Sequence, residues 1–149
     1  MSNIHAQAVA TIDAPAEIVY NILTDYQVGH PAILPRSYFT GLTVEQGGRG
    51  AGTVIVTRMQ VMGAERTFRM TVAEPQPGRV LVESDGKTTT TFTIEPSGAA
   101  LCRVTIATEA RPSPGLQGWI ERLFTPSFLR RVYRQELLKL KECANSSKP

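Results

Sequence analysis

The sequence predicts an α+β protein in which a seven-stranded antiparallel sheet is covered on one face by a long C-terminal helix. Two observations lead to this prediction. Residues 38–109 form six short runs of strand-forming residues divided by turn residues, and several runs alternate between apolar and polar side chains. Residues 116–141 instead repeat apolar side chains at helical spacing. A sheet with one apolar face is covered on one side only, and the terminal helix is the segment available to cover it.

The chain begins with a strand and a helix. Residues 4–12 alternate, and one side of that strand carries Ile4, Ala6, Ala8, Ala10 and Ile12. Asp13-Ala14-Pro15 ends the strand and starts a helix, because the missing N–H of proline would have no partner in a first helical turn. Apolar residues then recur at helical spacing up to Tyr26. The glycine and prolines that follow predict a turn or a second short helix at residues 31–34.

Six strands are expected next, at residues 38–46, 53–61, 67–74, 80–84, 88–95 and 101–109. Alternation is clear in the fourth strand of the chain, where Phe68, Met70 and Val72 lie opposite Arg69 and its neighbours. The direction of the Arg58 side chain is less clear, because neither face of its strand is cleanly polar. An outward Arg58 is the preferred interpretation, since a buried guanidinium would need an anionic partner.

The last segment carries two apolar stripes. They consist of Leu116, Trp119, Ile120, Leu123 and Phe124, and of Leu129, Val132, Tyr133, Leu137 and Leu140. At roughly 100° per residue the two stripes do not share a phase. Thr125-Pro126 has the pattern of an N-cap followed by a proline at the first helical position. We therefore predict a kink or break at Thr125-Pro126 that lets both stripes reach the sheet.

The length of 149 residues suits one domain. We predict a single domain over residues 1–144 and a disordered tail over residues 145–149. No apolar run approaches the roughly 18 residues of a membrane span, and residues 1–15 lack the pattern of a signal peptide. Two cysteines, Cys102 and Cys143, cannot form a disulfide framework. We expect a cytoplasmic protein with reduced thiols, and Cys102 in its core.

The net charge of +3 is unevenly distributed, because residues 116–149 carry +4 and residues 1–115 carry −1. A basic helix can bind nucleic acid or anionic lipid. Its aromatic residues do not interleave with the basic ones in a stacking pattern, so we interpret the charge as a solvated helix face. We do not expect nucleic acid binding.

Common catalytic and cofactor motifs are absent. The chain has no C-x-x-C or H-E-x-x-H pattern and only two histidines, so we expect no metal site. The glycine-rich segments at residues 48–52 and 85–88 lead into strands, whereas phosphate-binding loops lead into a helix. We expect no cofactor.

Several local sequences together resemble one family. They are residues 12–20, which include Ile12-Asp13-Ala14-Pro15, residues 50–53 and 74–79, and the helix at residues 130–141. With the order of elements, they resemble the START-like helix-grip (SRPBCC) superfamily, in its polyketide cyclase/dehydrase-like branch. The resemblance covers residues 4–143, and its motifs are structural rather than catalytic. It implies a seven-stranded sheet curved around a C-terminal helix, with an apolar cavity between them.

Alternation and the resemblance together give candidate residues for binding a ligand. Those expected to face the cavity are Met59, Phe68, Met70, Thr90, Phe92, Val104, Ile106, Trp119, Leu123, Phe124 and Tyr133. Tyr26, His30 and Tyr38 flank the short connection after the first helix and are expected at the cavity rim, where polar groups could orient a ligand. For each of these residues the alternative is an ordinary place in the core or in a loop.

Three functions remain open at this point. The first is binding of a hydrophobic small molecule, such as a lipid, sterol, polyketide or quinone. The second is a cyclase or dehydratase using acid–base groups in the cavity, for which the candidates are His30, Tyr38 and Glu83. The third is an interaction protein that uses the basic terminal helix. We rank them in that order, and the sequence allows either a monomer or a homodimer.

Overall fold

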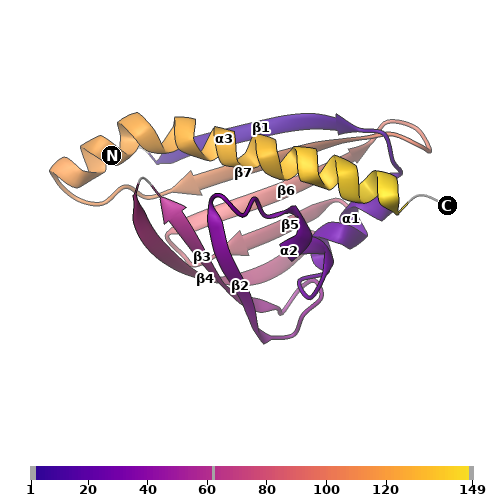
Figure 1. Cartoon of the computed structure of the whole chain (residues 1–149), viewed down its shortest axis with the longest axis horizontal. Helices are drawn as coiled ribbons and strands as arrows, with labels where there is room; N and C mark the ends of the chain where they lie inside the picture. The colour runs from indigo at the N-terminus through magenta and orange to yellow at the C-terminus, as the bar shows by residue number, and fades with distance from the viewer. Residues whose placement is uncertain (1–2, 62, 148–149) are drawn as a thin grey trace.

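The computed structural model describes residues 3–61 and 63–147 and has the predicted α+β architecture (Figure 1). The elements are β1 (Ile4–Ile12), α1 (Ala16–Thr24), α2 (Gly29–Ile33), β2 (Phe39–Gln46), β3 (Val54–Val61), β4 (Ala64–Gln76), β5 (Val80–Ser84), β6 (Thr88–Pro96), β7 (Cys102–Ala110) and α3 (Leu116–Ser146). The seven strands form one antiparallel sheet in the order β1-β7-β6-β5-β4-β3-β2. The helix-grip fold is therefore confirmed.

Both faces of the sheet follow the predicted alternation. In β1, Ile4, Ala6, Ala8 and Ile12 are buried while the residues between them are mostly exposed. Arg58 is exposed, so its outward interpretation is confirmed. Cys102 is fully buried, as expected, and burial raises the pKa of its thiol.

Helix α3 runs unbroken from Leu116 to Ser146 with Pro126 inside it, so the predicted break at Thr125-Pro126 is wrong. A continuous helix keeps a single phase relative to the sheet, and that phase is set by the buried second stripe, which includes Val132 and Leu140. The first stripe consequently faces solvent. Proline within a helix removes one backbone hydrogen bond, and here the helix continues without it.

The exposed first stripe corrects part of the predicted cavity lining. Trp119, Leu123 and Phe124 have exposed fractions of 64%, 59% and 56%, so they do not face the sheet. The expected disordered tail is also wrong at its start, because α3 includes residues 145 and 146. The last two residues of that tail, 148 and 149, lie outside the described residues.

The core lies between the inner face of the sheet and the C-terminal half of α3. Val104 and Ile106 of β7 have no exposed surface and belong to the same core cluster as Val132, Leu137 and Leu140 of α3. Figure 1 shows α3 lying across the sheet, with its first turns running past the ends of the strands. Among the described helices, none is both long and apolar enough to cross a membrane.

Candidate functional site

A cavity of about 220 Å³ lies between the sheet and α3. Its walls are largely apolar and are contributed by Met59, Phe68, Met70, Phe92, Phe128 and Leu129. The first four come from β3, β4 and β6, and the last two come from α3. The alternation of side chains along each strand determines which strand residues line the cavity, because every second residue points to the covered face.

One row of the inner face is polar. Glu83 of β5 pairs with Thr90 of β6, and Thr90 pairs with Thr108 of β7. Three neighbouring strands thus place polar side chains side by side, and all three side chains line the cavity. The next row toward the core, Leu81, Phe92 and Ile106, is apolar and fully or almost fully buried.

Helix α3 completes this polar row with Tyr133. The hydroxyls of Thr90 and Thr108 lie 2.8 Å apart, and Thr108 is also hydrogen-bonded to the Tyr133 hydroxyl. All three residues are buried. Their hydroxyls satisfy one another, as buried polar groups must, and each hydroxyl can act as donor or acceptor toward a ligand.

Glu83 is the centre of a second polar cluster. The Tyr26 hydroxyl donates a hydrogen bond of 2.6 Å to Glu83 Oε2, and His30 Nε2 lies 3.5 Å from the same oxygen. The Tyr26 and His30 rings are stacked with their centroids 4.6 Å apart, and Phe92 meets the imidazole edge-on. Burial and the neighbouring Glu83 carboxyl raise the pKa of the Tyr26 phenol, so it remains a donor.

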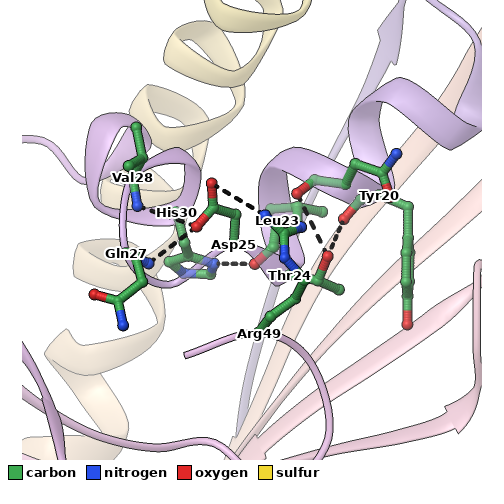
Figure 2. A network of polar contacts seen from close by, with 9 residues as sticks. Tyr20, Leu23, Thr24, Asp25, Gln27, Val28, His30 and Arg49 are labelled. Carbon is green, nitrogen blue, oxygen red and sulfur yellow. Dashed lines mark hydrogen bonds and ion pairs between the residues drawn. The ribbon is translucent and has the colours of Figure 1, made fainter. Parts of the chain in front are cut away.

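The connection between α1 and α2 holds His30 in place (Figure 2). The Asp25 carboxylate accepts hydrogen bonds from the backbone N–H groups of Gln27 and Val28, and Arg49 lies 3.6 Å from its other oxygen. The backbone N–H of His30 donates to the Asp25 carbonyl at 2.7 Å. Gly29 is required here, since a Cβ at this position would lie 2.5 Å from the Ile22 carbonyl oxygen.

The imidazole of His30 is fixed by a hydrogen bond to the backbone. Its Nδ1 lies 2.8 Å from the Leu23 carbonyl oxygen, which can only accept, so Nδ1 carries the hydrogen (Figure 2). The other nitrogen, Nε2, then faces the Glu83 carboxyl. The two groups lie 3.5 Å apart, and a histidine that faces a carboxyl group is a common arrangement in acid–base sites.

Glu136 of α3 is the second buried carboxyl of the cavity. Its exposed fraction is 2%, and it lines the same cavity as Glu83. Burial raises the pKa of this carboxyl well above its usual value, and the negative charge of Glu83 raises it further. This shift favours the neutral form of Glu136, in which a carboxyl can donate a proton.

The outer end of the cavity has a different charge. Arg66, Lys87 and Arg111 line it there together with Glu121 of α3. Partial burial opposes ionisation of Glu121, but hydrogen bonds from the backbone N–H and hydroxyl of Ser113 outweigh it and lower the pKa of the carboxyl. Three cations and one carboxylate therefore surround the mouth, whereas the inner end is lined by acids and hydroxyls.

The structure brings together many of the residues singled out from the sequence. The cavity is lined by Met59, Phe68, Met70, Glu83, Thr90, Phe92, Tyr133 and His30. His30, for which an ordinary loop position was the alternative, is 2% exposed and faces a carboxylate, so that alternative is wrong.

Other predicted residues lie elsewhere. Tyr26 stands behind the cavity wall and acts on Glu83, and Tyr38 packs edge-on against Phe128. Val104 and Ile106 lie in the filled core and do not line the cavity.

Sequence reasoning missed Glu136 and Thr108. Both carried a usable signal. Glu136 lies within the apolar stripe of α3, between Tyr133 and Leu137, where a charged residue faces the sheet. Thr108 continues the inward positions of β7 after Val104 and Ile106.

Among the residues that the structure describes, no group of three or more histidine, cysteine, aspartate or glutamate side chains is placed to hold a metal ion.

Comparisons with known proteins agree with this geometry. A family model described as polyketide cyclase / dehydrase and lipid transport matches residues 3–144. The solution structure of the KanY protein is similar with a TM-score of 0.83 and 28% identity, over 97% of this chain and 99% of that one. No curated protein sequence matches the chain.

More distant structures share the fold. A protein from Thermus thermophilus is similar with a TM-score of 0.79 and 19% identity, over 97% of this chain and 99% of that one. The Zhui aromatase/cyclase from Streptomyces is similar with a TM-score of 0.67 and 17% identity, over 95% of this chain and 91% of that one.

Proposed function

Because this chain belongs to the polyketide cyclase/dehydrase and lipid transport family, we propose that it binds a compact, oxygen-bearing aromatic molecule of the polyketide or quinone kind in the cavity. The observation that carries the proposal is the cavity itself, in which apolar walls lead to a polar row formed by Glu83, Thr90 and Thr108. Ligand sites typically combine apolar walls with a few placed polar groups. The apolar walls supply affinity, and the polar row orients the oxygens of the ligand.

The size of the cavity favours a compact ligand. Its volume of about 220 Å³ is smaller than the roughly 300–1,000 Å³ of most small-molecule pockets. Two methionines, Met59 and Met70, contribute to the wall and can re-pack around ligands of different outline. A molecule of a few fused rings fits this space better than a sterol or a long acyl chain.

Filling the cavity should remove binding. Met70→Trp places a larger side chain in the wall, and we expect the affinity for 2-naphthol, measured by isothermal titration calorimetry, to fall at least tenfold. Thr71→Trp is the matched control, because the neighbouring Thr71 is exposed on the other face of β4. Equal affinities in the wild type and Met70→Trp would show that the cavity is not the binding site.

Native mass spectrometry of protein purified from its own host would identify a bound ligand.

A second candidate function is acid–base catalysis on the bound molecule. The observation that favours it is the presence of two buried carboxyls in one cavity: Glu83, which contacts Tyr26 and His30, and Glu136, whose pKa is raised. A general acid with a raised pKa is typical of such catalysis. In the simplest step, Glu83 takes a proton from the carbon next to a ligand carbonyl, and Glu136 gives its proton to the carbonyl oxygen. The product is an enol, the species from which cyclisation or dehydration proceeds.

Glu83→Gln should abolish this enolisation. The exchange of the α-protons of 2-tetralone in heavy water, followed by nuclear magnetic resonance, is expected to be faster with the wild type than without protein. We expect Glu83→Gln to lose most of that acceleration, about 10²-fold or more, as is usual when a general base is removed. Glu95→Gln, an exposed residue of the next strand, should behave as the wild type. If Glu83→Gln keeps the full acceleration, the catalytic proposal fails while ligand binding can still hold.

A further inference from the structure

The N-terminal half of α3 has an inverted distribution of side chains. Large apolar residues face solvent there, and they are Leu116, Trp119, Ile120, Leu123 and Phe124, which we call the apolar face. The residues turned toward the sheet are small or polar, and include Gly118, Glu121 and Thr125. An amphipathic helix that packs only against its own domain has the opposite arrangement.

This orientation is held by specific contacts. Glu121 accepts hydrogen bonds of 2.8 and 2.9 Å from the backbone N–H and hydroxyl of Ser113, in the segment that leads into the helix. Gly118 lies directly against the same segment, where a Cβ would come within 1.9 Å of the Ser113 carbonyl oxygen. The polar side of the helix is thus fixed inward, and the apolar face is fixed outward.

Cations lie near the first turns of α3. The backbone N–H of Arg111 donates to the Lys87 carbonyl at 3.0 Å, so the two residues are neighbours. The charge of Lys87 acts on Glu121, which places this pair next to the first turns of α3. Arg66 of β4, in the hairpin formed by β3 and β4, also lines the cavity. Figure 1 shows that hairpin at the end of the molecule where α3 begins.

We propose that the apolar face of α3, together with Arg66, Lys87 and Arg111 at the same end of the molecule, docks on the surface of an anionic lipid bilayer. Contiguous exposed apolar residues mark interaction sites, and a helix with one apolar side and nearby cations lies in the headgroup region of a membrane. Trp119 suits this position, because tryptophan is enriched at membrane interfaces. The charge favours a lipid surface over a second copy of this chain, since the cations of one copy would repel those of the other.

Docking in this way would bring the cavity mouth to the bilayer. The same residues that supply the charge also line the cavity, so an apolar ligand could pass between bilayer and cavity without crossing water. The docking itself does not depend on the ligand proposed above, because it uses only the surface of the protein.

Intrinsic fluorescence provides a direct test, because Trp119 is the only tryptophan of the chain. With vesicles of equal parts phosphatidylcholine and phosphatidylglycerol, we expect a blue shift of its emission and co-sedimentation of the protein, both reduced by added salt. Vesicles of phosphatidylcholine alone should produce much less of either. The double variant Leu123→Ser/Phe124→Ser keeps the tryptophan and should bind at least tenfold more weakly.

Matched controls separate the apolar face from general effects. Leu138→Ser changes a residue of α3 that is as exposed as Leu123, at 59%, but lies outside the apolar face, and it should bind as the wild type. Lys87→Glu/Arg111→Glu should weaken binding, whereas Arg103→Glu, on an exposed position of β7, should not. The proposal is overturned if the wild type does not bind the anionic vesicles. It is also overturned if light scattering shows a dimer that Leu123→Ser/Phe124→Ser converts to a monomer without any vesicle binding.

Discussion

Glu136→Gln is expected to stabilise the folded protein at neutral pH and to flatten the dependence of its stability on pH. The wild-type carboxyl is buried among apolar groups and beside the Glu83 carboxyl, and both factors raise its pKa in the folded state. Glutamine has nearly the same shape and no charge to bury. It therefore removes the free energy that is needed at neutral pH to keep a proton on this carboxyl or to bury its charge.

The sign follows from proton linkage. A carboxyl with a raised pKa binds a proton more tightly in the folded than in the unfolded protein, so acid favours folding at this position. Its contribution is complete below the usual pKa near 4.5 and is lost as the pH rises toward the folded value. Within that range, stability falls by about 1.4 kcal/mol per pH unit. The free energy of unfolding of Glu136→Gln should not show this decrease with rising pH.

Urea unfolding at a series of pH values measures the effect. The free energies of unfolding of the wild type and Glu136→Gln should diverge progressively above about pH 4.5, with the variant the more stable. Glu142→Gln, an exposed position of the same helix, should leave the profile unchanged. Parallel profiles for the wild type and Glu136→Gln would mean that Glu136 ionises as it does in water.

Ile106→Ala should lower the free energy of unfolding by about 2–5 kcal/mol, the usual result of deleting a buried aliphatic side chain from a filled core. Ile106 has no exposed surface and lies in the core cluster rather than in the cavity wall. Strands held in a hydrogen-bonded sheet relax only partly into the space that is left. The loss therefore includes the packing contacts of the cavity left behind as well as the transfer of the side chain.

A graded series tests this placement. Ile106→Val should cost about 0.5–1.5 kcal/mol, and Val9→Ala, a partly exposed position of β1, should change stability by no more than about 0.5 kcal/mol. A loss well under 1 kcal/mol in Ile106→Ala would contradict a filled core here. It would place Ile106 in the wall of a hollow, as the sequence by itself had predicted.

The side chains that line the cavity differ in charge between its two ends. At the inner end, Glu83, Glu136 and Tyr133 offer proton donors and acceptors in a buried setting, where electrostatic interactions are strong. At the mouth, Arg66, Lys87 and Arg111 carry positive charge in contact with water. A ligand that enters from an anionic surface would pass the cations first and meet the acids last.

The sequence by itself determined the fold and the facing of most strands. Alternation within a strand is a local property, because successive side chains point to opposite faces wherever the strand lies. Met59, Phe68, Met70, Thr90 and Phe92 could therefore be assigned to the covered face. The stripe at Val132 and Leu140 identified the side of α3 that packs on the sheet for the same reason.

Tertiary structure decided what periodicity leaves open. The phase of the first half of α3 was predicted wrongly because apolar side chains were expected to face the core, whereas one unbroken helix keeps the phase of its best-packed half and leaves Trp119 in solvent. Likewise, His30 faces Glu83, which lies 53 positions later in the chain and reaches His30 only through the pairing of the strands. Local sequence sets which face a residue takes, but only the packing of distant segments decides whether that face meets solvent, a filled core or a cavity.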